Sequence, residues 1–255
     1  MVEVIWHSEG TSHGRERIFP NGTVELLVNL GEPFRLVEGR GEERFTTTWL
    51  SGLQSGPQVI EGPVRHRVLS VRLRPAGAYA LLAMPLREVS GLMVDLRDLV
   101  GPAADELAER CRDAPSVEEC FRLVAAWVSA RVARSPGVGS PIAWSAAQIE
   151  RSGGTVPIAG LRAETGLSKT RLAAAFRDQI GVAPKLYARI VRFRRVLAML
   201  QGGAGPLADV ALAAGYYDQP HMIAEFRELG GLAPREFLAA RYPHGDGITA
   251  AERSS

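Results

Sequence analysis

A segment near the C-terminal end of the chain occurs twice, and its two copies lie about 50 residues apart. The first copy spans residues 166–187 and the second spans residues 215–237. Both have a glycine, a short polar side chain, a stretch with helical spacing, a Phe-Arg pair, and an ending of glycine, Ala-Pro and an aromatic residue. Such a repeat is typical of a duplicated supersecondary unit. The pattern predicts a short helix, a glycine turn and a second helix, made twice.

The first copy predicts a helix over residues 158–164 and a turn at Gly166. A second helix then follows to about residue 179. Ser168 is expected to cap this second helix, because a hydroxyl at that position accepts a hydrogen bond from an amide of the first turn. The first unit is therefore predicted to be two helices separated by a tight turn.

The second copy repeats this pattern, with a helix over residues 207–214, a turn at Gly215 and a further helix capped by Asp218. Pro220 is compatible with that helix because the amides of a first turn have no helical partner. An uninterrupted helix over residues 184–200 is predicted between the two units. This helix is expected to fix the spacing of the units.

Residues 142–241 resemble the DNA-binding domain of AraC-type (AraC/XylS) transcriptional regulators. The resemblance is carried by the tandem units, the linker helix and, in the second unit, by Val210-Ala211-Leu212-Ala213-Ala214-Gly215-Tyr216, Asp218-Gln219, His221, Phe226-Arg227, Gly231 and Pro234-Arg235-Glu236-Phe237. It implies two helix-turn-helix units whose second helices enter successive major grooves of double-stranded DNA, about one helical turn or roughly 34 Å apart.

Carried over by position, the resemblance implies base contacts from Thr170, Ala173, Ala174, Gln219, Pro220, His221, Ile223 and Ala224. Phosphate contacts are expected from Lys169, Arg171, Arg177, Arg192 and Arg227. Arg192, like the neighbouring arginines of the linker helix, fits equally well in a solvated or domain-pairing surface. The two alanines of the first unit cannot donate hydrogen bonds, so that unit is expected to read thymine methyl groups or DNA shape.

The charge of the chain is distributed unevenly. Residues 1–150 hold 16 basic and 19 acidic side chains, whereas residues 151–243 hold 13 basic and 7 acidic ones. A basic C-terminal half joined to a slightly acidic N-terminal half fits nucleic-acid binding by the former. Chance variation in surface charge is the alternative.

Residues 1–75 read mainly as strands that alternate in hydropathy, for example over 23–30 and 69–73, and turn signals separate them. Many short strands of this kind indicate a small barrel or a sandwich. Helices are predicted over 76–83, 98–112 and 116–132. The chain is therefore expected to be α+β, with a linker at residues 135–141 and a flexible tail at residues 242–255.

Residues 1–134 resemble, more weakly, an N-terminal domain found on some AraC-type regulators. The resemblance rests on Phe19-Pro20-Asn21-Gly22, on the following strand to Gly31, and on Val71-Arg72-Leu73-Arg74-Pro75. It implies a small, cupin-like β-barrel followed by helices. This domain would sense a small-molecule effector, make homodimer contacts, or both.

Trp6, Phe45, Trp49 and His66 are the candidates for lining a ligand pocket in this barrel, although aromatic side chains also form barrel cores. The rival interpretation is a cupin-type enzyme with the helical half as an accessory. Metal cupins need two or three histidines and a carboxylate on one face, and here His7, His13 and His66 are scattered. We therefore expect no metal, cofactor or catalytic residue.

Cys111 and Cys120 are the two cysteines of the chain. Their spacing matches no zinc site, and a disulfide between them is disfavoured in a reducing compartment. No apolar run approaches the roughly 18 residues of a membrane helix, and the N-terminus carries acidic residues in place of a basic signal-peptide head. The sequence therefore predicts a cytoplasmic regulator with no membrane partner.

Overall fold

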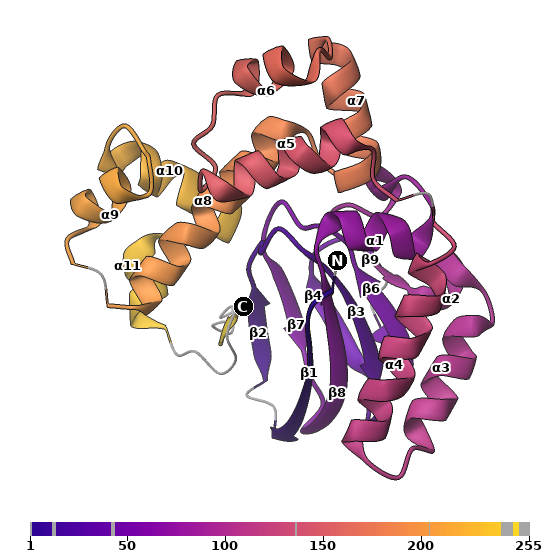
Figure 1. Ribbon diagram of the computed structural model, residues 1–255. Coiled ribbons are helices and arrows are strands. Elements are labelled where there is room, and N and C mark those ends of the chain that lie inside the picture. Colours follow the sequence, from indigo (N-terminus) through magenta and orange to yellow (C-terminus); the bar gives the residue numbers. More distant parts are fainter. Residues whose placement is uncertain are drawn as a thin grey trace.

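The computed structural model describes residues 2–11, 14–41, 44–135, 137–203, 205–240 and 247–249, with strands in the first part and helices in the second (Figure 1). The strands are β1 Val2–Thr11, β2 Arg15–Ile18, β3 Val24–Asn29, β4 Phe34–Glu38, β5 Arg44–Phe45, β6 Thr48–Ser51, β7 Gln58–Glu61, β8 Arg65–Leu73, β9 Met93–Asp95 and β10 Gly247–Thr249. The helices are α1 Pro75–Leu82, the 3-10 helix η1 Leu86–Glu88, α2 Leu96–Val100, α3 Ala103–Arg112, α4 Val117–Val132, α5 Ser140–Arg151, α6 Ile158–Thr165, α7 Lys169–Ile180, α8 Pro184–Gln201, α9 Leu207–Ala213, α10 Gln219–Gly230 and α11 Pro234–Ala239.

The strands form two antiparallel sheets of five strands each, in the orders β1-β8-β3-β6-β9 and β10-β2-β7-β4-β5. The strands do not close into the small, cupin-like barrel that the resemblance implied, and the α+β class is confirmed. The physical reason lies at the sheet edges, where β5 has two residues and β9 has three. Strands this short cannot form a continuous ladder of backbone hydrogen bonds from one sheet to the other. Among the described residues, an isolated bridge pairs Gly41 with Met93 near these edges.

The alternation predicted for residues 23–30 is confirmed by β3. Val24, Leu26 and Val28 are buried on the face of the first sheet that the helices cover. They lie opposite Leu73, Val71 and Leu69 of β8, which point the same way. Helices α1, α3 and α4 cover this face (Figure 1). The opposite face of the sheet packs against the second sheet.

One of the predicted N-terminal helices differs from the structure. The single helix expected over residues 98–112 is split into α2 and α3, because Gly101 takes a positive φ of 70° and Pro102 follows it. Within the region read mainly as strands, residues 45–50 are divided between β5 and β6. The helix predicted over residues 116–132 is present as α4, and the Ser116 hydroxyl caps it by accepting a hydrogen bond from the Glu119 amide at 3.3 Å.

The helical half is arranged about α8, which confirms the uninterrupted helix predicted for residues 184–200. Helices α6 and α7 lie toward one end of α8, and α9, α10 and α11 lie toward the other (Figure 1). The aromatic side chains of Phe176, Tyr187, Phe193, Phe226 and Phe237 are fully buried. They belong to the same continuous core as the helix-covered face of the first sheet, so the two halves pack directly against each other.

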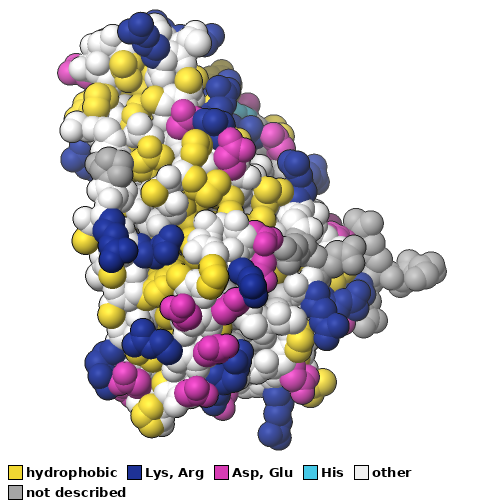
Figure 2. Space-filling model, turned by 90° about the vertical axis from the view of Figure 1, so that its right-hand side faces the viewer, with side chains coloured by type: hydrophobic (Ala, Val, Ile, Leu, Met, Phe, Trp, Pro, Cys, Tyr) yellow, Lys and Arg dark blue, Asp and Glu magenta, His cyan; other side chains and the backbone are white. Residues whose placement is uncertain are grey.

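Helix α5 begins at Ser140, within the predicted linker. The predicted tail, residues 242–255, lies mostly outside the described residues, but residues 247–249 form β10 and pair with β2. Figure 2 shows the molecule from the side on which α3 and α4 lie. On this face, basic and acidic side chains are intermixed and neither sign dominates. Among the described residues, no helix combines the length and apolar character needed to span a bilayer.

Candidate nucleic-acid interface

The first duplicated segment forms the helix pair α6–α7. Helix α6 ends at Gly166, which takes a left-handed φ of 66°. The chain then turns into α7, where the Ser168 hydroxyl accepts a hydrogen bond from the Arg171 amide at 3.3 Å. Gly181 ends α7 with a φ of 106°. A residue other than glycine would be strained at both of these turns, so the repeated glycines fix where the helices stop.

The second duplicated segment forms the helix pair α9–α10 in the same way. Gly215 provides the turn with a φ of 84°, and the Asp218 carboxylate accepts a hydrogen bond from the His221 amide at 2.8 Å. Pro220 lies in the first turn of α10, as predicted. Gly231 ends α10 with a φ of 71°. The two pairs are therefore matched in their caps, turns and buried faces.

Each pair leaves one face of its second helix accessible. Among the base-contact candidates, Thr170, Ala174, Pro220, His221 and Ala224 are exposed, and Ala173, Gln219 and Ile223 are half-buried. On α7 this face carries methyl groups and one hydroxyl, whereas on α10 it carries an amide and an imidazole. The His221 ring stands edge-on to the Tyr216 ring, with centroids 5.3 Å apart. The polar groups that could read base edges are thus concentrated on α10.

The phosphate-contact candidates fall into two groups. Lys169, Arg171, Arg177 and Arg227 are exposed on the same two helices. Arg192 is instead only 18 % exposed at its side chain and is bound within the protein. Arg192 therefore lies between elements of the helical half, bonded to Glu225 and Gly154, and the phosphate contact expected of it stays a prediction.

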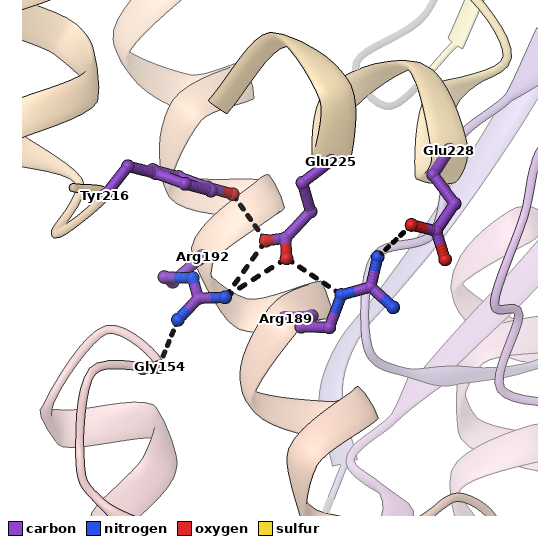
Figure 3. A network of polar contacts seen from close by, with 6 residues as sticks. All are labelled: Gly154, Arg189, Arg192, Tyr216, Glu225 and Glu228. Carbon is purple, nitrogen blue, oxygen red and sulfur yellow. Dashed lines mark hydrogen bonds and ion pairs between the residues drawn. The ribbon is translucent and has the colours of Figure 1, made fainter. Parts of the chain in front are cut away.

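Glu225 of α10 is the residue that binds Arg192, and sequence reasoning did not single it out. This carboxylate is 5 % exposed and lies between α10 and α8 (Figure 3). It accepts hydrogen bonds from Arg189 Nε at 2.8 Å, from Arg192 Nη2 at 3.1 and 3.2 Å, and from Tyr216 Oη at 2.7 Å. The signal in the sequence is an acidic residue three positions after buried Met222, because an acid on the buried face of a helix needs a charged partner.

These contacts change the acid–base properties of their members. Burial, together with the Glu225 carboxylate, raises the pKa of the Tyr216 hydroxyl. Hydrogen bonding to Glu228 raises the pKa of Arg189, and the same bond lowers the pKa of the Glu228 carboxyl. Each of these shifts favours the protonation state in which the cluster is bonded.

The N-terminal half contacts the C-terminal ends of both α7 and α10. A Cβ atom on Gly181 would lie 2.3 Å from Ser90 Oγ, and one on Gly231 would lie 2.7 Å from Arg17 Nη1 and 2.9 Å from Pro57. Helix α7 packs against η1 and α1. Gly181 and Gly231 therefore have a second role. Because they have no side chain, the N-terminal half can pack closely against the C-terminal end of each helix.

Phe19 lies between the halves at a second place. It follows β2 and is 3 % exposed. Its ring makes edge contacts with Phe193 of α8 and Phe237 of α11, at centroid distances of 6.2 and 5.6 Å. Ion pairs between Arg87 and Asp178, and between Arg194 and Glu3, also join the halves. The sheet domain and the helical half thus share one packed interface.

A cavity of about 490 Å³ opens at this interface. One wall is the segment from Phe19 to Thr23, and the other is the face of α8 from Val191 to Gln201. Its charged lining residues are Glu3, Arg74, Glu150, Arg194 and Arg195. The cavity therefore carries three arginines and two carboxylates, and it contacts both halves of the chain.

The predicted pocket residues of the N-terminal half lie elsewhere, between the two sheets. Phe45 stacks on Trp49 at 5.3 Å, and Phe34 lies 5.5 Å from the same indole. His66 lies edge-on to Phe34 at 6.3 Å and is 2.8 Å from the Ser8 hydroxyl. Phe34, Phe45 and Trp49 belong to one packed apolar cluster. Trp6 is half-buried on the edge strand β1, opposite Ser70 of β8.

The chemistry of the cysteines and histidines is also clear from their surroundings. Within the described residues, no group of three or more His, Cys, Asp or Glu side chains is arranged to hold a metal ion. Cys111 and Cys120 are buried free thiols, and Cys120 Sγ lies 3.1 Å from the Cys111 carbonyl oxygen. Burial raises the pKa of the Cys111 thiol to about 12. Neither thiol is therefore exposed as a nucleophile.

Comparison with known proteins gives two family matches and a fold. Residues 161–240 match the family described as a helix-turn-helix domain, and residues 1–95 match a domain of unknown function, DUF6597. Among curated proteins, none matches the sequence significantly.

The structure is similar to that of ToxT from Vibrio cholerae, with 12% identity, a TM-score of 0.50, and 93% of this chain and 98% of that chain covered. ToxT bound to (E)-4-(8-methylnaphthalen-1-yl)but-3-enoic acid matches equally, with 12% identity, a TM-score of 0.50, and 93% and 99% covered. The AraC-like transcriptional activator CuxR matches more weakly, with 17% identity, a TM-score of 0.32 and 78% of each chain covered. The chain therefore joins an N-terminal segment that matches DUF6597 to a C-terminal segment that matches the helix-turn-helix family, in a fold similar to that of ToxT.

Proposed function

We propose that this chain binds double-stranded DNA sequence-specifically and regulates transcription, using α6–α7 and α9–α10 as two helix-turn-helix units. The observation that supports this best is the matching of the two pairs: each has a capped second helix with an accessible face, and α8 holds the two together. Two such helices carried by one chain would enter successive major grooves on one side of the duplex. The basic character of residues 151–243 favours the same partner.

The two units would contribute differently to recognition. Helix α10 presents Gln219 and His221, which can hydrogen-bond to base edges. Helix α7 presents Thr170 and two alanines beside Lys169 and Arg177, which suit thymine methyl groups and phosphates. The second unit would therefore read most of the polar sequence information, and the first would hold the DNA backbone and sense its shape.

Gel retardation of the purified protein on the DNA upstream of its own gene tests the function. We expect a specific complex that resists competitor DNA and weakens steeply with salt, because each phosphate contact releases a counterion. If no fragment of the source genome were specifically retarded at modest salt, the proposed function would be wrong.

We further propose that a small anionic effector controls this activity from the cavity between the halves. Arg74, Arg194 and Arg195 suit a carboxylate or phosphate, and the structurally similar ToxT binds a carboxylic acid. An occupant would touch both the Phe19–Thr23 segment and α8, so it could change how the sheet domain packs against the second unit. A homodimer through the N-terminal domain is the alternative means of control.

Thermal unfolding in the presence of small carboxylic acids tests the effector site. Binding stabilises the folded state by RT ln(1 + c/Kd), where c is the ligand concentration, so the melting temperature rises with the logarithm of c once c exceeds the dissociation constant. We expect the rise to shrink in Arg195→Ala and to persist in Arg122→Ala, an exposed arginine on α4 far from the cavity. An equal rise in both variants would place the ligand elsewhere.

A further inference from the structure

The cluster around Glu225 joins elements that a DNA-binding protein of this design must hold apart at a fixed distance. Glu225 lies on α10, Arg189 and Arg192 lie on α8, and Tyr216 lies in the turn before α10 (Figure 3). The carboxylate receives four hydrogen bonds from these three side chains. Its two oxygens are thus held from several directions, and α10 is fixed in both position and rotation against α8.

The same cluster extends to the first unit. Arg192 Nη1 donates to the carbonyl oxygen of Gly154 at 3.4 Å, and Gly154 lies in the segment that leads into α6. Next to it, the methyl group of Thr155 packs so tightly on Gly215 that a Cβ atom there would lie 2.3 Å away. Gly215 is the turn of the second unit. Arg192 therefore binds the segment that leads into the first unit through one guanidinium nitrogen and the second unit through another.

Apolar packing alone holds helices together, and the hydrogen bonds of the cluster add a directional restraint to it. Replacing a buried ion pair by apolar side chains of similar volume is often neutral or even stabilising. Hydrogen bonds differ in being directional, since they weaken steeply when the donor angle departs from its preferred range. The cluster therefore contributes mainly to geometry, because its hydrogen bonds restrain the angle and distance between α7 and α10.

We propose that Glu225, Arg192 and Arg189 are positioning residues that set the separation of the two recognition helices, and thereby restrict the protein to DNA sites with one spacing between half-sites. This inference rests on the proposed function. In B-DNA each added base pair moves a half-site by about 3.4 Å and turns it by about 34°. A rigid joint cannot follow such a change, whereas a loosened joint can.

The spacing test uses a duplex recovered by selection from genomic fragments, together with versions that carry one or two extra base pairs between the half-sites. For the wild-type protein we expect one insertion to weaken binding roughly tenfold or more, as expected when base contacts of one half-site are lost. For the double variant Glu225→Met, Arg192→Met we expect a loss of threefold or less on insertion, with weaker binding to the natural spacing.

The double variant replaces both partners, so it leaves no buried charge of the pair unmatched and is expected to fold; circular dichroism checks this. Glu228→Gln is the matched control, because this carboxylate binds Arg189 but is 63 % exposed and is neither of the two substituted residues. It should keep the wild-type penalty for insertion. A folded double variant with an undiminished penalty would overturn the inference.

A second measurement needs no DNA and separates the two proposals. Cysteines introduced at Ala163 on α6 and Ala213 on α9, both exposed, carry spin labels for pulsed electron paramagnetic resonance. Buried Cys111 and Cys120 are not expected to react with the label. The distance distribution should be narrow in the parent and clearly broader in the double variant. Equal widths in the parent and the double variant would overturn the positioning role. If the double variant gave the broader distribution but the wild-type protein failed to bind DNA, only the proposed function would be overturned.

Discussion

Substitution of Phe19 by alanine should separate the two halves of the protein. The side chain is 3 % exposed and its ring contacts Phe193 and Phe237. Truncation of a buried phenylalanine costs about 3–5 kcal/mol, made up of lost apolar transfer energy and the cavity left behind. Of this destabilisation, about 0.5–1.5 kcal/mol for each neighbouring ring comes from the loss of an edge-on aromatic contact. The position is therefore expected to rank among the most sensitive in the chain.

The consequence is specific because Phe19 belongs to the sheet domain and its partners belong to α8 and α11. We expect urea unfolding of Phe19→Ala, followed by circular dichroism and tryptophan fluorescence, to show loss of the helical half at lower urea than the wild type. Phe19→Leu, which keeps much of the apolar volume, should lose less than half as much. Tyr217→Ala provides the control, because this side chain is 88 % exposed and its removal should change stability by no more than about 0.5 kcal/mol.

The reasoning would be refuted by an unfolding free energy of Phe19→Ala within about 1 kcal/mol of the wild type, since a fully packed ring cannot be removed so cheaply. It would also be refuted if Tyr217→Ala were equally destabilising. Either result would mean that the halves are not held together at Phe19.

Three further predictions follow from the site and the buried thiol. Gln219→Ala should relax sequence preference, whereas Lys169→Ala should weaken binding to all sequences alike and reduce the salt slope by about 1, as gel shifts on matched and scrambled duplexes would show. Ser168→Ala and Asp218→Ala should each cost about 0.5–2 kcal/mol through the lost helix cap, measured by urea unfolding. Above pH 9 the wild type should lose stability up to about pH 12, because the raised pKa of Cys111 keeps it protonated only when folded; Cys111→Ala should show a shallower decline.

Each of these has a contrary outcome. A uniform loss of affinity in Gln219→Ala would make that residue a structural or phosphate contact. Unchanged stability on removal of either cap would show that the corresponding helix does not begin at that residue. Parallel alkaline declines for the wild type and Cys111→Ala would mean that the thiol does not contribute to the pH dependence.

Local signals predicted the helical half well. Glycine turns, cap residues and apolar spacing act over a few residues, so Ser168 and Asp218 could be identified as caps from the sequence, and both hydrogen bonds are present. Helix α8 could also be predicted, because an uninterrupted helical pattern in the sequence indicated its length.

Contacts between distant segments could not be predicted in this way. Arg192 looks like a phosphate ligand in a list of basic residues, and only the folded chain brings it to Glu225, 33 positions away. Phe19 similarly reads as part of a turn motif, while its partners come from the other half of the chain. Whether the strands close into a barrel depends on how the short edge strands pair, and tertiary contacts determine that pairing. The local strand pattern therefore suited a barrel, whereas the structure has two separate sheets.

Selection of genomic fragments by the purified wild-type protein tests the central claim most directly. The recovered sites should share two half-sites about one helical turn apart, roughly 10 base pairs between centres, with stronger base preference in the half-site bound by α10. Substituting Gln219 and His221 together should erase preference in that half-site and leave the other intact. Recovery of fragments with no shared sequence, or of sites with a single contacted half, would contradict the account.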